Sequence, residues 1–112
     1  MSAGNYTFLA EQGGTFNLLA TWKDEDGPIN LNGYTAKMQA RDKTNTLVIE
    51  LNTSNGRIAL GGAAGTIQFT ISATDTSNLP VGMYEYDLFM TVGSTVTKLL
   101  EGDFVVVKKV TS

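Results

Sequence analysis

The stretch Tyr34-Thr-Ala-Lys-Met-Gln-Ala-Arg41 carries the clearest structural signal in this chain. Every second residue in it is apolar, and polar or charged residues stand between the apolar ones. Because the side chains of a β-strand point alternately to its two faces, this period of two predicts a strand with one face on a core. Residues 16–22 and 67–71 show the same alternation. The sequence therefore predicts half-buried strands at all three places.

Outward from these strands, turn-forming residues divide the chain into further short apolar segments. Asn55-Gly56 is the strongest signal for a two-residue hairpin, and Glu101-Gly102 is expected to break or bulge the last strand. Residues 72–78 are the one segment expected to hold a helical turn, because serine and threonine are available there as caps. The expected strands cover residues 5–10, 15–22, 34–41, 47–51, 57–60, 66–71, 83–92 (the longest), 95–100 and 103–110.

So many short strands without a long helix predict an all-β, antiparallel sandwich or barrel of about eight strands. At 112 residues the chain has the size of one domain, and no linker or repeat divides it, so a single domain over residues 1–112 is expected. Residues 83–92 and 104–107 are apolar beyond a single face. Such segments are typical of central, buried strands, and the alternative is a face or edge that docks onto another subunit.

The chain contains no histidine and no cysteine. These side chains most often supply nucleophiles, general bases and transition-metal ligands near neutral pH, so their absence favours a scaffold or binding module over an enzyme. The net charge of −3 argues against a nucleic-acid partner and an anionic membrane surface. No signal peptide is recognisable at the N-terminus, and the longest apolar run, 104–107, is too short to span a membrane, so synthesis in the cytoplasm is expected.

Three short motifs invite a chemical interpretation, and each has a simpler structural one. Asp24-Glu-Asp-Gly27 offers carboxylates to calcium, but Thr35 stands where an EF-hand has its glutamate, so a solvated hairpin tip is favoured. Gly61-Gly-Ala-Ala-Gly-Thr66 lacks the lysine and the helix of a phosphate loop, which favours a flexible hairpin loop. Glu85 and Asp87 share one strand face, which favours a charged surface over a catalytic pair. No catalytic residue, cofactor, metal or small-molecule substrate is therefore expected.

Several runs of the sequence together resemble small virion proteins of tailed bacteriophages. In those proteins an acidic turn and a P-I-x-L-x-G-Y-x-A-x-M-x-x-R hairpin open an immunoglobulin-like or baseplate-upper-protein-like β-sandwich. The resemblance extends over nearly the whole chain. The runs that carry it are residues 16–41, which contain the acidic turn and this motif, Asn55-Gly-Arg-Ile-Ala-Leu60, Gly65-Thr-Ile-Gln-Phe-Thr-Ile-Ser-Ala73, Leu79-Pro-Val-Gly-Met-Tyr-Glu-Tyr-Asp-Leu-Phe89 and Leu99-Leu-Glu-Gly102.

The resemblance implies an immunoglobulin-like fold and a non-enzymatic structural role in a virion, most directly as a tail, baseplate or fibre-adaptor subunit. The implied partners are other virion proteins in a symmetric assembly, in which the chain is a homo-oligomer or is present in many copies. A capsid decoration (cement) protein is the first alternative. A carbohydrate-binding β-sandwich module is the second, and it would show an exposed aromatic platform.

Termini and loop tips are the expected contact sites of an assembling chain. Residues 1–6 are expected to form a poorly anchored arm that a neighbour would order. The acidic tip would meet a basic patch, and the glycine loop would allow close approach of a neighbouring backbone. The candidate interface residues are Asn5, Tyr6, Asp24, Glu25, Asp26, Gly61, Gly62 and Gly65.

Overall fold

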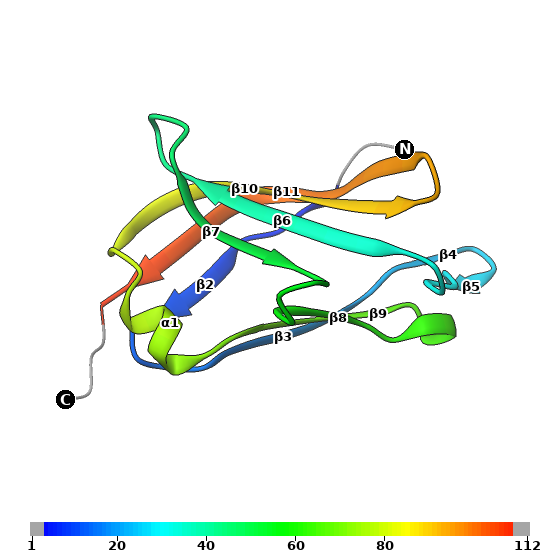
Figure 1. Ribbon diagram of the computed structural model, residues 1–112, viewed down its shortest axis with the longest axis horizontal. Helices are drawn as coiled ribbons and strands as arrows, with labels where there is room; N and C mark the ends of the chain where they lie inside the picture. Colours follow the sequence, from blue (N-terminus) through cyan, green and yellow to red (C-terminus); the bar gives the residue numbers. More distant parts are fainter. Residues whose placement is uncertain (1–3, 109–112) are drawn as a thin grey trace.

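Two β-sheets packed face to face form the body of the molecule (Figure 1). The computed structural model describes residues 4–108. The larger sheet has the order β1-β11-β10-β6-β7, with β2 also paired to β11, and the smaller sheet has the order β3-β9-β8. The larger sheet consists of β1 (Gly4–Asn5), β2 (Phe8–Glu11), β6 (Thr35–Arg41), β7 (Leu47–Asn52), β10 (Gly82–Val92) and β11 (Thr95–Val107). The smaller sheet consists of β3 (Phe16–Thr21), β8 (Ile58–Leu60) and β9 (Thr66–Ile71).

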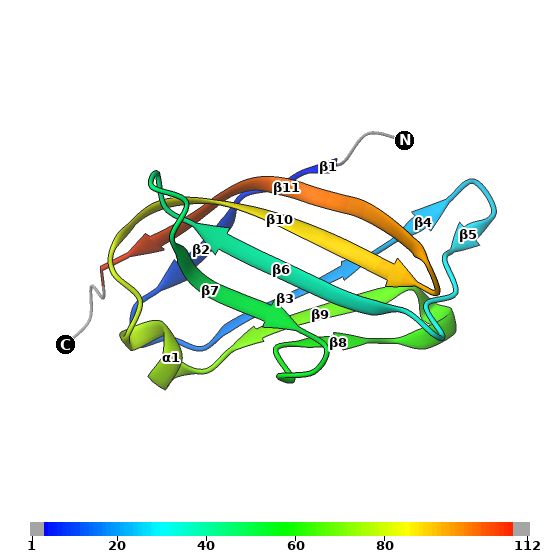
Figure 2. The same cartoon turned by 45° about the horizontal axis from the view of Figure 1, so that its top comes forward.

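Short elements close the two ends of the sandwich (Figure 2). At one end, β4 (Lys23–Asp24) and β5 (Gly27–Pro28) form a small hairpin, and η1 (Gly62–Ala64) connects β8 to β9. At the other end, α1 (Ala73–Ser77) follows β9. Its N-cap, Ser72, accepts a hydrogen bond from the Asp75 N–H, which confirms the predicted helical turn and cap. Within the described residues, no helix has the length and apolar character needed to cross a membrane.

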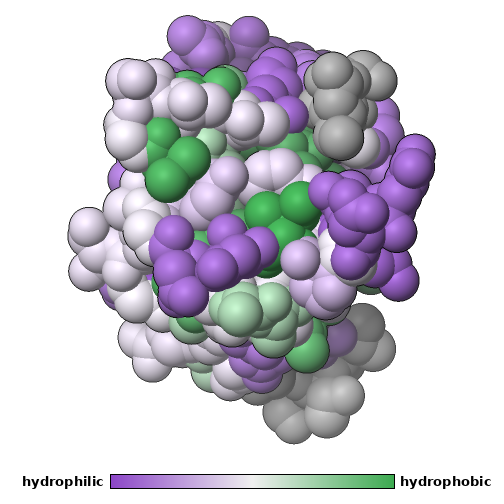
Figure 3. All heavy atoms as spheres, turned by 90° about the vertical axis from the view of Figure 1, so that its right-hand side faces the viewer, coloured by the Kyte–Doolittle hydropathy of each residue, from purple (hydrophilic) through white to green (hydrophobic). Residues whose placement is uncertain are grey.

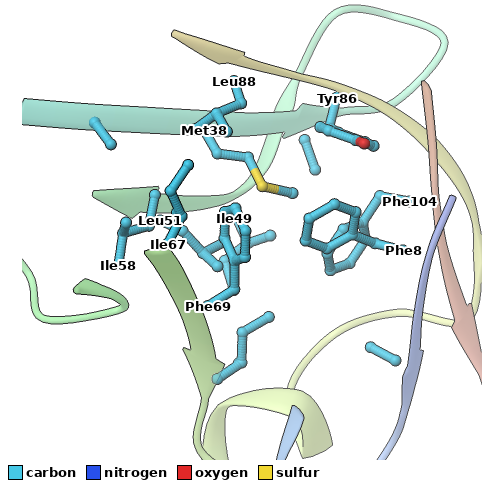
Figure 4. Close-up of a cluster of buried hydrophobic side chains, with 14 of the residues drawn as sticks. Phe8, Met38, Ile49, Leu51, Ile58, Ile67, Phe69, Tyr86, Leu88 and Phe104 are labelled. Carbon is cyan, nitrogen blue, oxygen red and sulfur yellow. The ribbon is translucent and has the colours of Figure 1, made fainter. Parts of the chain in front are cut away.

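The core lies between the sheets and consists of alternate residues of their strands (Figure 4). Phe8 is at the centre of an aromatic group, with its ring centroid 5.1 Å from that of Phe69 and 6.1 Å from that of Phe104. The ring of Tyr86 is closer still, at 4.7 Å. Burial of each large apolar side chain contributes on the order of 1.5–3 kcal/mol, so this layer dominates stability. The other largest buried side chains are Leu31, Met38, Leu51, Ile58, Ile67, Ile71, Leu88, Met90 and Val106.

These strands confirm the predicted all-β, antiparallel sandwich. Ala36, Met38 and Ala40 of β6 are buried, as their alternation predicts. Eight of the described strands have three or more residues, in agreement with the expected number. Trp22, directly after β3, is partly buried against the core and meets Tyr34 edge-on with ring centroids 5.8 Å apart.

The first strand departs from the prediction in its direction. β1 and β2 run parallel to β11, with Gly4 opposite Leu100 and Phe8 opposite Phe104. Both pairings keep one register, and only residues 6–7 interrupt the strand. Alternation specifies which face of a strand is buried but not the direction of its neighbour, so the parallel pairing of this strand within the antiparallel sandwich was not predicted.

The turn at Asn55-Gly56 is not a two-residue hairpin, because β7 and β8 belong to different sheets. Residues 53–57 cross from one sheet to the other. The Asn55 side chain organises the crossing: its carbonyl oxygen accepts from the N–H groups of Asn52 (3.1 Å) and Arg57 (3.0 Å). Its amide nitrogen donates to the Glu50 carbonyl at 3.0 Å. An asparagine that bonds nearby backbone groups in this way stabilises an irregular turn as well as a hairpin.

The last strand is also longer than predicted. β11 has 13 residues and β10 has 11, and the expected break at Glu101-Gly102 is absent. The irregularity lies two residues earlier, because the pairing of β10 with β11 skips Leu99. An unpaired extra residue of this kind is a β-bulge, and it shifts every later pairing by one residue.

Tyr84 forms a corner where the chain enters β10. Its ring is buried, and its hydroxyl donates a hydrogen bond of 2.7 Å to the carbonyl of Pro80, four residues earlier. A tyrosine near the start of this strand that bonds back to the preceding connection is a hallmark of immunoglobulin sandwiches. The contact fixes the angle at which the chain passes from the smaller sheet to the larger one.

Candidate interaction site

The acidic tip lies at one end of the sandwich, in the hairpin of β4 and β5 (Figures 1 and 2). Asp24, Glu25 and Asp26 are exposed, and the Asp26 N–H donates to Oδ1 of Asp24 at 2.8 Å. Among residues 4–108, no group of three histidine, cysteine or acidic side chains is placed so that it could hold a metal ion. The structure places a solvated hairpin tip at this position.

The glycine loop lies at the same end, because η1 connects β8 to β9 there (Figure 1). The Leu31 N–H donates to the Gly62 carbonyl at 2.9 Å, and the Trp22 N–H donates to the Gly65 carbonyl at 2.8 Å. Gly65 is buried with φ 70°, and a Cβ there would lie 2.8 Å from the Trp22 carbonyl. Glycine at this position therefore serves internal packing, whereas Gly61 is exposed. Figure 3 faces this end and shows hydrophobic residues in separate groups among hydrophilic ones.

Asn5 and Tyr6 are held against β11, contrary to the expectation of a poorly anchored arm. Asn5 pairs with Glu101, and the Tyr6 N–H donates to the Glu101 carbonyl at 3.1 Å. The Tyr86 hydroxyl donates to the Tyr6 carbonyl at 2.6 Å. Gly102 permits this close approach, because a Cβ there would lie 2.5 Å from the Tyr6 carbonyl oxygen. The first three residues of the expected arm lie outside the described part of the chain.

A polar hollow of about 600 Å³ lies on the outer face of the larger sheet. Side chains from β6, β10 and β11 line it, together with the turn that follows β6. Of the predicted interface residues only Asn5 lines this hollow; the acidic tip and the glycine loop lie elsewhere. Its charged lining residues are Arg41, Asp42, Lys43, Glu85, Asp87, Lys98, Glu101 and Asp103.

Four of these carboxylates are neighbours across β10 and β11. The register places Glu85 opposite Asp103 and Asp87 opposite Glu101. Residues two apart on a strand share a face, so the four side chains form one block of like charge, which we call the acidic block. Like charges directly opposite each other destabilise a sheet. The bulge at Leu99 creates the block. Without it the register would shift by one residue, and Glu85 and Asp87 would no longer lie opposite Asp103 and Glu101.

Two basic side chains are fixed beside the acidic block. The Arg41 guanidinium donates to Oε1 of Gln39 at 2.6 Å and to the Asn45 carbonyl at 3.0 Å. The Lys98 ammonium lies 3.3 Å from the Glu101 carboxylate. In the described part of the chain no other carboxylate of the acidic block forms an ion pair. The hollow therefore presents both signs of charge in a fixed arrangement, with negative charge in excess at the block.

The turn after β6 is held by hydrogen bonds to one carboxylate. Asp42 accepts from the Thr44 hydroxyl at 2.7 Å and from the N–H groups of Thr44 and Thr46 at 2.9 and 3.0 Å. The Thr44 hydroxyl and then the Thr46 N–H lower the pKa of Asp42 below its ordinary value. Burial raises the pKa of the Tyr86 hydroxyl, which donates a hydrogen bond to the Tyr6 carbonyl. The bonds to Asp42 hold the turn that borders the hollow.

The sequence indicated only part of this site. Alternation placed Glu85 and Asp87 on one face, but it missed their partners Glu101 and Asp103 on β11. The available signal was the tight turn at residues 93–94, which the structure confirms, because β10 and β11 pair directly on either side of it. Residue pairs between β10 and β11 can be counted outward from that turn, but the count is wrong beyond the bulge, since nothing in the residue pattern marks Leu99 as the skipped position.

The strand order, the corner tyrosine and the short helix before β10 together define an immunoglobulin-like β-sandwich. β11, β10 and β6 take the places of strands G, F and C, while β3, β9 and β8 take those of B, E and D. The chain has no cysteine for the disulfide that antibody domains form between strands B and F. Tyr86 stands two residues after the corner Tyr84, where the second of those cysteines would be, and packs against Phe8.

Comparison with solved structures supports this class of fold. Over 94% of its length, the chain is similar to 56% of a chain in the crystal structure of ICOS in complex with ICOS-L and an anti-ICOS-L VNAR domain. The TM-score is 0.50 and the sequence identity is 14%, so the likeness is one of fold alone. The chain spans little more than half the length of that structure's chain. No protein-family model matches the chain, and no curated protein matches it.

Proposed function

We propose that this chain is a non-enzymatic structural component of a tailed-phage virion, where it acts through protein–protein contacts as a tail, baseplate or fibre-adaptor subunit. The resemblance of its sequence runs between Phe16 and Gly102 to small virion proteins supports the proposal. Its partners are then other virion proteins in a symmetric assembly, and its location is the virion.

The hollow on the outer face of the larger sheet is the observation that carries the binding role. Glu85, Asp87 and Asp103 repel one another and form no ion pair within the described residues. Lysine or arginine side chains from a partner would relieve that repulsion and gain specificity from the fixed geometry. The partner surface is therefore basic opposite the acidic block and acidic opposite Arg41 and Lys98.

Incorporation of charge-reversed variants into particles tests this proposal. Glu85→Lys combined with Asp87→Lys is expected to reduce the copies per purified particle by about tenfold or more, because like charges would then face the partner. The matched comparison is Asp24→Lys combined with Glu25→Lys, which makes the same charge change at the acidic tip, the contact that the sequence suggested. This variant is expected to incorporate normally, because the proposal assigns the contact to the hollow. Thermal unfolding of both variants checks that the fold is retained.

Two results would contradict the proposal in different ways. Normal incorporation of the Glu85 and Asp87 variant would show that the hollow is not the contact. Absence of the unaltered chain from every particle would reject the virion role itself. A decoration protein remains the alternative position within a particle, and it binds preformed shells in many copies, whereas a tail subunit is present in far fewer. Quantitative mass spectrometry of purified particles separates the two.

A carbohydrate-binding module is the second candidate, because the hollow has the volume of a small-ligand site and amides and carboxylates line it. Against it stands the lack of an aromatic platform among the described residues of the hollow. Tyr86 is 4% exposed there, and its hydroxyl is bonded to the Tyr6 carbonyl. Saturable sugar binding that is lost in the Glu85 and Asp87 variant would favour this module over the protein contact.

A further inference from the structure

The edge strand β3 presents an open row of backbone hydrogen-bonding groups. Residues of an antiparallel strand direct their N–H and C=O groups alternately to its two sides. The Trp22 N–H bonds to the Gly65 carbonyl on the β9 side, so the even-numbered residues of β3 also face β9. The groups of Asn17, Leu19 and Thr21 consequently face the free edge. In the part of the chain that the structure describes, they have no backbone partner.

The edge at β7, by contrast, is covered by side chains. The Glu50 carbonyl accepts hydrogen bonds from the Asn55 amide at 3.0 Å and from the Arg57 guanidinium at 2.9 Å. The Asn52 N–H donates to the Asn55 side chain at 3.1 Å. A further strand could pair with β7 only by breaking these bonds. β3 has no charge, no proline and no bulge, which are the usual means of protecting an edge strand.

The side chains of β3 are also suited to a contact. Leu19 is 60% exposed on the outer face of the smaller sheet. On the inner face, Phe16, Leu18 and Ala20 pack against the core but stay only partly buried. Association along this edge would remove apolar surface of both faces from water, which is favourable. The surrounding outer face is uncharged and consists of Asn17, Thr21, Ala59, Thr66, Gln68 and Thr70.

We propose that two copies of this chain pair antiparallel through β3 across a two-fold axis at Leu19. The three outward-facing backbone positions are centred on Leu19, so the axis places Leu19 opposite its equivalent and Asn17 opposite Thr21 of the second copy. On the inner face, Phe16 then lies opposite Trp22 of the second copy. The two smaller sheets become one continuous sheet. This contact is separate from the hollow, which lies on the other sheet.

The lack of charge on β3 favours a second copy of this chain as the partner at this edge. A two-fold axis brings each residue close to its own equivalent, so a charged strand would repel itself. β3 and the outer face beside it carry no charge that such an arrangement would oppose. The outward-bonding positions of the strand, Asn17, Leu19 and Thr21, are symmetric about Leu19, so the strand is complementary to a second copy of itself in that register.

Site-specific crosslinking tests the register directly. The chain has no cysteine, so Leu19→Cys introduces a unique thiol. Directly opposite hydrogen-bonded residues of an antiparallel pair have Cα atoms about 5.5 Å apart, and a short bis-maleimide reagent bridges that distance. A covalent dimer of twice 12.0 kDa is expected. Thr21→Cys is the matched control on the same face, and its equivalents lie about 14 Å apart along the pair, beyond the reagent. No crosslink at Leu19, or equal crosslinking at Thr21, would overturn the register.

Sedimentation of the isolated chain over a concentration series tests the association. The native chain is expected to dimerise, and Leu19→Lys is expected to raise the dissociation constant about tenfold or more, because two ammonium groups would face each other. Leu9→Lys is the control, since Leu9 has the same 60% exposure but lies on β2 of the larger sheet, away from the β3 edge. A native chain that stays monomeric, or equal weakening by Leu9→Lys, would overturn the proposal. Neither result depends on incorporation into particles.

Discussion

Thr76 shows at the scale of one residue how a single hydroxyl joins two distant segments. It is fully buried, and its Oγ1 donates to the Gly14 carbonyl at 2.7 Å and accepts from the Gly13 N–H at 3.1 Å. These bonds tie α1 to the turn between β2 and β3. The backbone groups of Gly13 and Gly14 are partly buried, and leaving them without partners would be costly.

Replacement of this hydroxyl gives the first prediction. Thr76→Val keeps the shape but leaves the Gly13 N–H and the Gly14 carbonyl unpaired, so the free energy of unfolding is expected to fall by about 1–3 kcal/mol. Urea unfolding measures this change. Thr74→Val, at an exposed position of the same helix, is the control and is expected to stay within about 0.5 kcal/mol. Equal stability of the two variants would show that the buried bonds contribute nothing.

At the scale of elements, β11 organises the larger sheet, because β1 pairs with one of its edges and β10 pairs with the other. Gly102 is the point at which three of these strands meet. It has φ 150°, and a Cβ would lie 2.5 Å from the Tyr6 carbonyl oxygen. The Tyr86 hydroxyl binds that same carbonyl from β10. The position of the N-terminal strand therefore depends on the lack of a side chain at Gly102 as much as on the hydrogen bonds that Tyr6 makes.

Gly102→Ala is expected to displace β1 and to lower the free energy of unfolding by about 1–3 kcal/mol, since it combines a strained φ with a collision. Hydrogen exchange measures the displacement, and faster exchange of the Tyr6 N–H is expected. Gly56→Ala provides the comparison: it shares a positive φ of 79° but has open space around it. It is expected to destabilise the fold without changing exchange at Tyr6, and identical exchange in both variants would contradict the role of close approach.

The same elements mark the limit of what the sequence predicts. Alternation along β3, β6 and β9 predicted their buried faces, because that information lies within each strand. The helical turn and its cap at Ser72 were likewise predicted from residues 72–78 alone, because serine and threonine cap helices through nearby backbone groups. Pairing is different: the direction of β1, the crossing at Asn55 and the bulge at Leu99 are decided by the whole sheet. The acidic block followed the same division, because the pair of Glu85 and Asp87 was visible along its strand, while its union with Glu101 and Asp103 depended on the bulge.

At the scale of the whole molecule, the two outer faces differ in character. The larger sheet has a charged face with a hollow, and the smaller sheet has an uncharged face with an open edge. Contact with a different protein through the first and with a second copy through the second would make the chain bivalent. Repeated contacts of that kind gain strength from their number, which suits a symmetric particle.

Stability of the whole molecule is expected to be constant between about pH 6 and 8, because no histidine titrates in that range. The pKa values of Asp75 and Glu50 are lowered from 3.8 and 4.5, by the Arg57 contact in the first case and the Gln39 amide in the second. A lowered pKa means that the charged form favours folding. This stability is therefore fully present above those ordinary values and is lost as the pH falls through the lower, folded ones.

The urea midpoint measured against pH checks this prediction. It is expected to be flat near neutrality and to fall below about pH 4, where these carboxylates begin to accept protons. Asp75→Asn removes the contact of 2.8 Å with Arg57 and is expected to reduce the acid-dependent part of the loss. A large change in the midpoint between pH 6 and 8 would contradict the prediction and would require a carboxylate with a strongly raised pKa.

The most direct measurement is a cryo-EM map of a tailed-phage particle that carries this chain, with the sandwich located by its density. We expect the density on the tail or baseplate, with the hollow on the larger sheet covered by a neighbouring protein and two copies joined along β3. Density tiled over the shell would instead establish the decoration role. Absence of the chain from the particle would contradict the structural role, and a hollow left open to solvent would contradict the proposed contact.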